Sequence, residues 1–174
     1  ATVKRPAESF QPILKRMRED LSDDRGVKEA CVSLCVLVPN RSDKAAFVAE
    51  GGIETLKEAL LCHKFDREVE KAVYRTLDQF TFDCYEATVR VGADDGVLKL
   101  LESLAGVIGS DMLTEIEVVH AVASALDANE DNRASFVHHG GIEMMTLLMK
   151  TYKNEWEMQR SVCCLVGNLC LEAK

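Results

Sequence analysis

The sequence predicts an all-α protein folded as a right-handed α-solenoid, a superhelix of about four three-helix repeats. Three similar segments each contain a glycine at an equivalent position, and these glycines lie 44 and 45 residues apart. Each segment is followed by a stretch whose apolar residues recur at helical spacing. A unit of about 40 residues cannot bury its apolar faces alone, so successive units must cover one another. The three segments are residues 46–53, 90–97 and 135–142.

The glycine pairs predict where the helices of a unit begin and end. Gly51-Gly52 and Gly140-Gly141 indicate a sharp break between a short first helix and a longer second helix, because glycine tolerates positive φ and close backbone approach. A weaker copy at 10–17 has Pro12 in place of the second glycine, and proline suits the first turn of a helix. The predicted second helices therefore cover residues 10–17, 53–61, 97–104 and 142–149.

A third helix is predicted in every unit from a small residue followed five positions later by a larger one. Unequal spacing between these helices assigns the extra residues to loops, at 81–85 and at 105–111. The whole chain, 1–174, is then one repeat domain with approximate units 7–40, 41–84, 85–128 and 129–174. The residue pairs are Ala30 and Cys35, Ala72 and Leu77, Ala121 and Leu126, and Ser161 and Val166.

In these features the sequence resembles the armadillo repeat family, most closely at 132–142 and 159–169. The resemblance covers nearly the whole chain, and its pattern marks no catalytic residue. It implies a protein–protein interaction scaffold or adaptor, whose third helices line a concave groove that holds an extended peptide or a partner protein. Two other functions remain open, a self-assembling structural module and a regulatory subunit of an enzyme complex.

The resemblance also places groove residues one before, three after and seven after each small residue. Import receptors of this fold repeat a tryptophan at the second of these sites and an asparagine at the third. Here only Asn168 fits, and Trp156 is expected in the turn before the last third helix, so recognition of nuclear-import signals is not expected. The groove residues so implied are Lys71, Arg75, Gln79, His120, Ser124, Arg160, Cys164 and Asn168, with Glu29, Ser33, Leu37 and Ala128 at the remaining sites.

Charge suggests the kind of partner. Lys71, Arg75 and Arg160 would favour an acidic or phosphorylated partner through charge-assisted bonds, unless they are ordinary solvated helix residues. The net charge of −8 argues against nucleic acid and against a membrane surface as partner. The longest apolar stretch, 162–171, is too short to span a bilayer and no signal peptide opens the chain, so we expect a cytoplasmic protein, with the nucleus as the other compartment.

No pattern of catalysis or of cofactor binding is present in the sequence. The glycine pairs lack the lysine and the Ser or Thr of a phosphate loop, and His120 has no acid or nucleophile at a recognisable spacing. The seven cysteines form no zinc-type pairs, so we expect no metal and interpret them as buried free thiols of a reducing compartment. The sequence therefore predicts a protein that is not an enzyme.

The last predicted helix, 161–171, is apolar on nearly every face. Terminal repeats of a solenoid need a polar outer surface to remain soluble. We therefore expect this helix to be covered, either by a further unit of a longer solenoid of which the chain is a fragment, or by end-to-end association with another copy.

Overall fold

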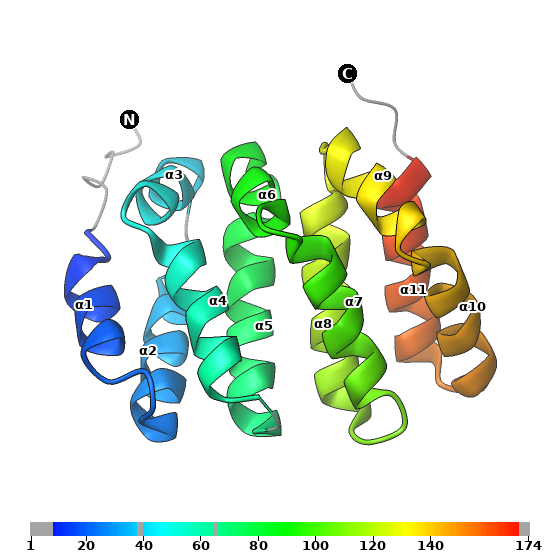
Figure 1. Cartoon of the computed structure of the whole chain (residues 1–174), viewed down its shortest axis with the longest axis horizontal. Helices are drawn as coiled ribbons and strands as arrows, with labels where there is room; N and C mark the ends of the chain where they lie inside the picture. The colour runs from blue at the N-terminus through cyan, green and yellow to red at the C-terminus, as the bar shows by residue number, and fades with distance from the viewer. Residues whose placement is uncertain (1–8, 38–39, 65, 171–174) are drawn as a thin grey trace, which may run out of the picture.

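The computed structural model describes residues 9–37, 40–64 and 66–170, and within these ranges it is entirely helical. The expected all-α class is confirmed, with eleven helices and no strand in the described ranges (Figure 1). The helices are α1 (Gln11–Glu19), α2 (Asp24–Val36), α3 (Arg41–Ala49), α4 (Gly52–Cys62), α5 (Arg67–Thr81), α6 (Tyr85–Gly92), α7 (Gly96–Val107), α8 (Met112–Leu126), α9 (Glu130–His138), α10 (Gly141–Thr151) and α11 (Trp156–Cys170).

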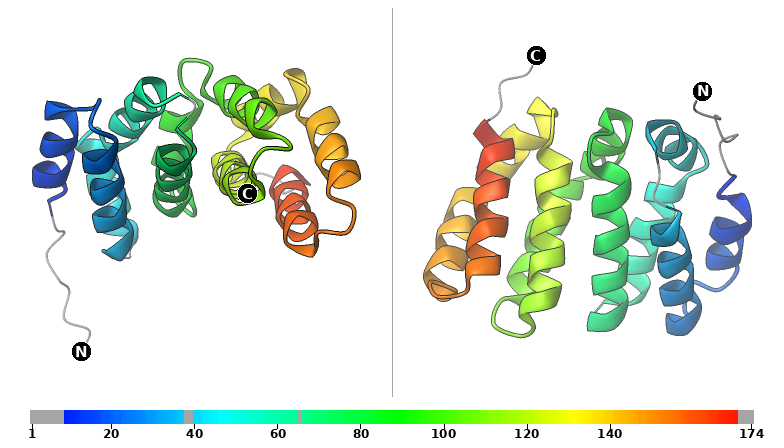
Figure 2. Two further views of the ribbon diagram at one scale, coloured as in Figure 1. Left: turned by 90° about the horizontal axis from the view of Figure 1, so that it is seen from below. Right: turned by 180° about the vertical axis from the view of Figure 1, so that it is seen from behind.

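The helices form two layers that follow the order of the chain. The predicted third helices α2, α5, α8 and α11 stand side by side in one row, and each packs against the next. The predicted second helices α1, α4, α7 and α10 form the other row, with the short helices α3, α6 and α9 across one end. Figure 2 shows that the rows are curved and that α2, α5, α8 and α11 lie on the inner side of the curve. We call this row the inner row.

The glycine pairs make the breaks that the sequence predicts. Gly51 and Gly140 adopt left-handed φ angles of 78° and 82°, and the third break has Asp95 at 59° in the same position. The second glycine of each pair is required for a different reason, which is space. A Cβ atom on Gly52 would lie 2.3 Å from the ring of Phe47, and one on Gly141 would lie 2.4 Å from the ring of Phe136. One glycine therefore supplies the conformation, and the next leaves room for a core phenylalanine.

Two details of the predicted boundaries are wrong. Residues 105–107 continue α7 instead of forming a loop, because Leu104 and Val107 extend the buried stripe of that helix. The loop that follows is held to the fourth unit: the Tyr152 hydroxyl accepts from Gly109 N at 3.0 Å and donates to the buried Glu115 at 2.7 Å. Trp156 is not in a turn but is the first residue of α11.

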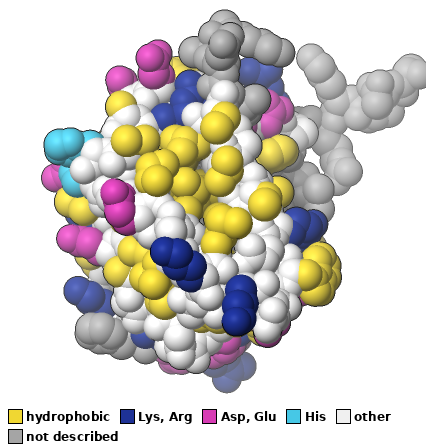
Figure 3. Space-filling model, turned by 90° about the vertical axis from the view of Figure 1, so that its right-hand side faces the viewer, with side chains coloured by type: hydrophobic (Ala, Val, Ile, Leu, Met, Phe, Trp, Pro, Cys, Tyr) yellow, Lys and Arg dark blue, Asp and Glu magenta, His cyan; other side chains and the backbone are white. Residues whose placement is uncertain are grey.

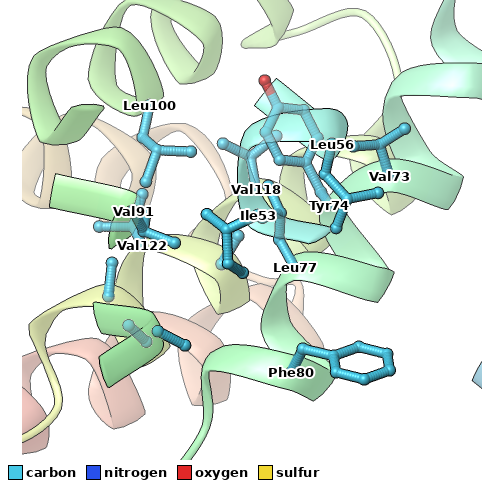
Figure 4. Close-up of a cluster of buried hydrophobic side chains, with 14 of the residues drawn as sticks. Ile53, Leu56, Val73, Tyr74, Leu77, Phe80, Val91, Leu100, Val118 and Val122 are labelled. Carbon is cyan, nitrogen blue, oxygen red and sulfur yellow. The ribbon is translucent and has the colours of Figure 1, made fainter. Parts of the chain in front are cut away.

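The core is continuous from unit to unit. The rings of Phe10, Phe47 and Phe80 contact one another, and the Phe47 and Phe80 rings are stacked at a centroid distance of 3.9 Å. Further along, aliphatic side chains of several helices interdigitate around Tyr74, as Figure 4 shows for Ile53 and Val118. No unit has a separate core, so the stability of each unit depends on its neighbours.

Polar side chains also link successive units. Arg18 of α1 donates to the carbonyls of Glu50 and Gly51 at 2.8 and 3.0 Å, just after α3 ends. Lys57 of α4 does the same for the next unit, donating to the carbonyls of Arg90 and Ala93 at the end of α6. Cations suit helix C-termini, where carbonyl groups lack helical partners.

The cysteines differ from the expectation of buried thiols. Cys31 and Cys84 are buried, and burial raises the pKa of the Cys31 thiol to about 12. Four others are exposed: three lie on α11, the last helix of the inner row, and one lies at the end of α4. All seven are free thiols, and the exposed ones are Cys62, Cys163, Cys164 and Cys170. Among the described helices, none combines the length and apolarity that crossing a bilayer requires.

Candidate partner-binding groove

Eight of the predicted groove residues lie in the inner row on three neighbouring helices; of the remaining sites, Glu29 and Ser33 lie on α2, and Leu37 and Ala128 lie beyond the ends of α2 and α8. α8 lies between α5 and α11 and packs against both, so residues up to 97 positions apart in the sequence share one layer. The residues are Lys71, Arg75 and Gln79 on α5, His120 and Ser124 on α8, and Arg160, Cys164 and Asn168 on α11.

Two of the three predicted groove cations already have carboxylate partners. Arg75 donates from Nε and Nη2 to Glu117 Oε1 at 2.9 and 2.5 Å, and Glu117 raises the pKa of this guanidinium. Lys71 Nζ donates to Glu68 Oε1 at 2.7 Å. The charge that these cations present to a partner is therefore partly cancelled.

The sequence interpretation missed these glutamates, although the repeat contains the signal for them. Glu68, Glu117 and Glu157 each lie four residues before the small residue of their third helix. Their common position in the repeat places one carboxylate in each of the last three units along the inner row. The groove thus carries a repeated acidic position beside its basic ones.

The polar groove residues bond to neighbouring third helices. Gln79 Nε2 donates to the Cys35 carbonyl at 3.0 Å, and Asn168 Nδ2 donates to the Ala123 carbonyl at 2.8 Å. Buried Ser124 donates to Asp78 of α5. These bonds occupy side chains that would otherwise face a bound peptide, and they join adjacent units.

His120 and Ser161 form a pair that resembles a base and a nucleophile, with 2.9 Å between His120 Nε2 and Ser161 Oγ. Ser161 is buried, however, and its hydroxyl donates to the Glu157 carbonyl at 3.0 Å. A hydroxyl in this state accepts a hydrogen bond from the imidazole and has no access to a substrate. The pair therefore joins α8 to α11. Within the described ranges, no three His, Cys, Asp or Glu side chains converge as metal ligands.

One end of the inner row presents an uncompensated cation beside an exposed aromatic ring. The Arg160 guanidinium carbon lies 5.7 Å from the centre of the Trp156 ring, one helical turn away on α11. Trp156 is 67% exposed, and Arg160 forms no ion pair with any described residue. At the other end, α2 exposes Val32 and Val36. Tryptophan and arginine are the residue types most enriched among those that dominate binding energy at protein interfaces.

The last unit has a second exposed surface, on the side away from α7 and α8. Figure 3 views the molecule from this end and shows apolar side chains gathered into a patch. On α11 itself, Val162 and Leu165 are buried against the stack, while Cys163 and Val166 are exposed. Large apolar side chains that remain exposed on α9, α10 and α11 include Val137, Ile142, Leu147, Met149 and Val166, and we call this set the end patch.

Comparisons with known proteins give the fold and nothing on activity. No family model matches the sequence, and no curated protein matches it. Two crystal structures of engineered proteins are similar, each at 22% sequence identity over 92% of this chain, with TM-scores of 0.77 and 0.78. The chain spans 62% of the length of one and 37% of the other. The similarity supports the helical architecture and says nothing about a partner.

Proposed function

We propose that this chain is an armadillo-like right-handed solenoid module that acts as a protein-binding adaptor through its inner row. The observation that carries the proposal is the Trp156–Arg160 pair on α11, a helix of the inner row: an exposed aromatic ring beside a cation that has no carboxylate partner among the described residues. The repeated glycine breaks and the four aligned third helices support the family resemblance on which this role rests. The module performs no chemistry of its own.

The partner is an acidic or phosphorylated segment that contacts Arg160. A carboxylate or phosphate there gains a charge-assisted bond that none of the described residues supplies. Arg75 can add to this contact, since its side chain is 62% exposed while it pairs with Glu117. Glu68, Glu117 and Glu157 would repel a partner that carries a long acidic stretch. The negative charge of the partner must therefore be confined to the short segment that contacts Arg160.

Affinity capture with paired variants tests the adaptor role. The groove variant carries Trp156→Ala with Arg160→Glu, and the matched control is Lys153→Glu, which reverses a charge in the nearby turn. We expect a partner that the wild type and the control retain and the groove variant loses at least about tenfold, because truncating such a pair removes the anchoring contact. Cross-linking then maps its contact segment. A partner that binds all three proteins equally would contradict the use of the groove.

The charge preference needs its own measurement. Once the segment is mapped, a peptide copy and a copy with its acidic residues changed to lysine are titrated against the wild-type protein. We expect the acidic copy to bind more tightly, and phosphorylation of a serine or threonine in it to tighten binding further. Stronger binding of the basic copy would overturn the preference. A regulatory subunit would use the same groove, and an enzyme recovered as the partner would indicate that role.

The end patch favours a second candidate function, self-association of the module. Exposed apolar patches rimmed by polar residues are typical of protein interfaces. Light scattering at two concentrations should show an increase in mean mass, and Leu147→Glu should abolish it while Val89→Glu, at an exposed site on α6, should not. A wild-type protein that is monomeric at both concentrations would remove this candidate.

A further inference from the structure

A cavity of about 210 Å³ lies between α4, α5 and α7, where the second helices of two neighbouring units diverge. None of the proposed groove residues lines it, so the cavity is separate from the inner-row groove. Its walls are largely apolar. Figure 4 shows four of the lining side chains, with Leu100 and Val91 on one side and Tyr74 and Leu77 on the other.

The rim of the cavity is positively charged, although the protein as a whole is acidic. Four lining residues are cations and two are carboxylates, whereas the complete chain carries a net charge of −8. The lining therefore has a local excess of two positive charges. The cations are Lys57, Lys64, Arg67 and Lys99, and the carboxylates are Glu70 and Glu102.

Two of these cations lack carboxylate partners. Lys57 Nζ donates to the carbonyls of Arg90 and Ala93, and Lys99 Nζ donates to the carbonyl of Asp94 at 2.5 Å. Neither ammonium forms an ion pair within the described part of the chain. Burial lowers the pKa of Lys57, and Lys99 adds to this effect, while the nearby carboxylates of Asp94 and Glu54 oppose it without an ion-pair contact. An anion placed between these ammonium groups would relieve both the burial cost and the mutual repulsion.

From the apolar walls and the two ammonium groups at the rim, we infer that this cavity binds a small amphiphilic monocarboxylate. Its apolar chain would lie against Tyr74 and Leu100, and its carboxylate would lie between Lys57 and Lys99. A volume of 210 Å³ corresponds to roughly seven water-sized groups, which sets the chain at about seven or eight carbons. Such a ligand would contact two neighbouring units, at a site beside the second helices α4 and α7, whereas the proposed adaptor groove lies along the inner row.

The test uses octanoate, with octan-1-ol as the uncharged ligand of equal chain length. Heteronuclear NMR titration of the wild-type protein should shift the methyl signals of Leu60, Leu61 and Leu100, and octanoate should bind at least about tenfold more tightly than octanol. No saturable shift with octanoate would overturn the inference. Equal affinity of the two ligands would also overturn it, because the ammonium groups would then play no part.

Three variants locate the site. Lys99→Gln should weaken octanoate binding about threefold or more without changing octanol binding, as expected for the loss of one partly exposed charge contact. Lys153→Gln, in the turn before α11, is the matched control and should bind like the wild type. Ser103→Leu fills the cavity and should abolish binding of both ligands. Unchanged octanoate affinity in either Lys99→Gln or Ser103→Leu would place the ligand elsewhere and contradict the inference.

Discussion

At the scale of single residues, the glycines show how one residue type serves two purposes in the same turn. Gly51 provides a left-handed conformation, whereas Gly52 provides space against Phe47. Gly167, in contrast, lies within α11, and apart from the local backbone of that helix no described atom lies within 4 Å of the position of its missing Cβ. The sequence predicts a helix break at Gly51-Gly52 and a continuous helix through Gly167, but the space that Gly52 leaves depends on what lies against it in the fold.

The two glycines therefore predict opposite effects of the same substitution. Gly52→Ala should lower the free energy of unfolding by about 1–3 kcal/mol, because the new methyl group overlaps the Phe47 ring. Gly167→Ala should raise it by about 0.5–1 kcal/mol, because alanine loses less backbone entropy in a helix. Urea denaturation measures both. Equal changes for the two variants would show that the ring at residue 47 does not restrict the turn.

Tyr74 predicts a dependence of stability on alkaline pH. Burial raises the pKa of its hydroxyl from 10.0 to about 12, so the unfolded chain ionises first as the pH rises. The stability associated with the neutral phenol is complete below pH 10 and is lost between pH 10 and 12, by about 1.4 kcal/mol at pH 11. Tyr74→Phe should reduce the loss between pH 9 and 11 by this amount in urea titrations. A slope identical to that of the wild type would contradict the assignment.

At the scale of elements, sequence patterns predict where the helices lie in the chain, but they do not predict which helices contact one another. The apolar spacing predicted 53–61, 97–104 and 142–149, and α4, α7 and α10 contain these ranges. The short helix α9 gives an example of a contact between helices that the apolar spacing does not predict. Asn132 is buried and donates from Nδ2 to the carbonyls of Thr88 and Ala125 at 2.9 and 2.7 Å. It thereby holds α9 to both α6 and α8, over a distance of 44 residues in the case of Thr88.

Asn132→Ala should lower the free energy of unfolding by about 2–3 kcal/mol, since two buried carbonyls lose their donor. The matched control is Asn154→Ala, at an exposed position in the turn before α11, which should change stability by less than about 0.5 kcal/mol. Chemical denaturation of the two variants under the same conditions gives the comparison. Similar stability of both variants would mean that the carbonyls find other donors.

At the scale of the whole molecule, stability should vary along the stack. α8 packs against α5, α6, α7, α9 and α11, whereas the main contacts of α1 are with α2 and α4. In a repeat array each unit is stabilised by its nearest neighbours, so elements with neighbours on both sides open last.

Amide hydrogen exchange should therefore be slowest in α5 and α8 and much faster in α1. The measurement is residue-resolved exchange by NMR under native conditions, with α10 expected to lie between these limits because one of its faces is exposed. Uniform protection from α1 to α11 would instead indicate a single cooperative unit without the graded behaviour of a stack.

The sequence by itself determined the helices, their order and the period of the stack. Apolar spacing and glycine conformation act within a few residues, and these local effects do not depend on the rest of the fold. The sequence also predicts which residues line a partner-binding groove, and this stays a prediction. Only the tertiary structure decided that Arg75 meets Glu117 and that Gln79 and Asn168 bond to carbonyls of the preceding third helix. Gln79 reaches the fifth residue after Ala30 and Asn168 the second after Ala121, so equivalent side chains meet different positions. That offset, like the cavity between α4 and α7, depends on how whole units pack against one another, which no local pattern in the chain specifies.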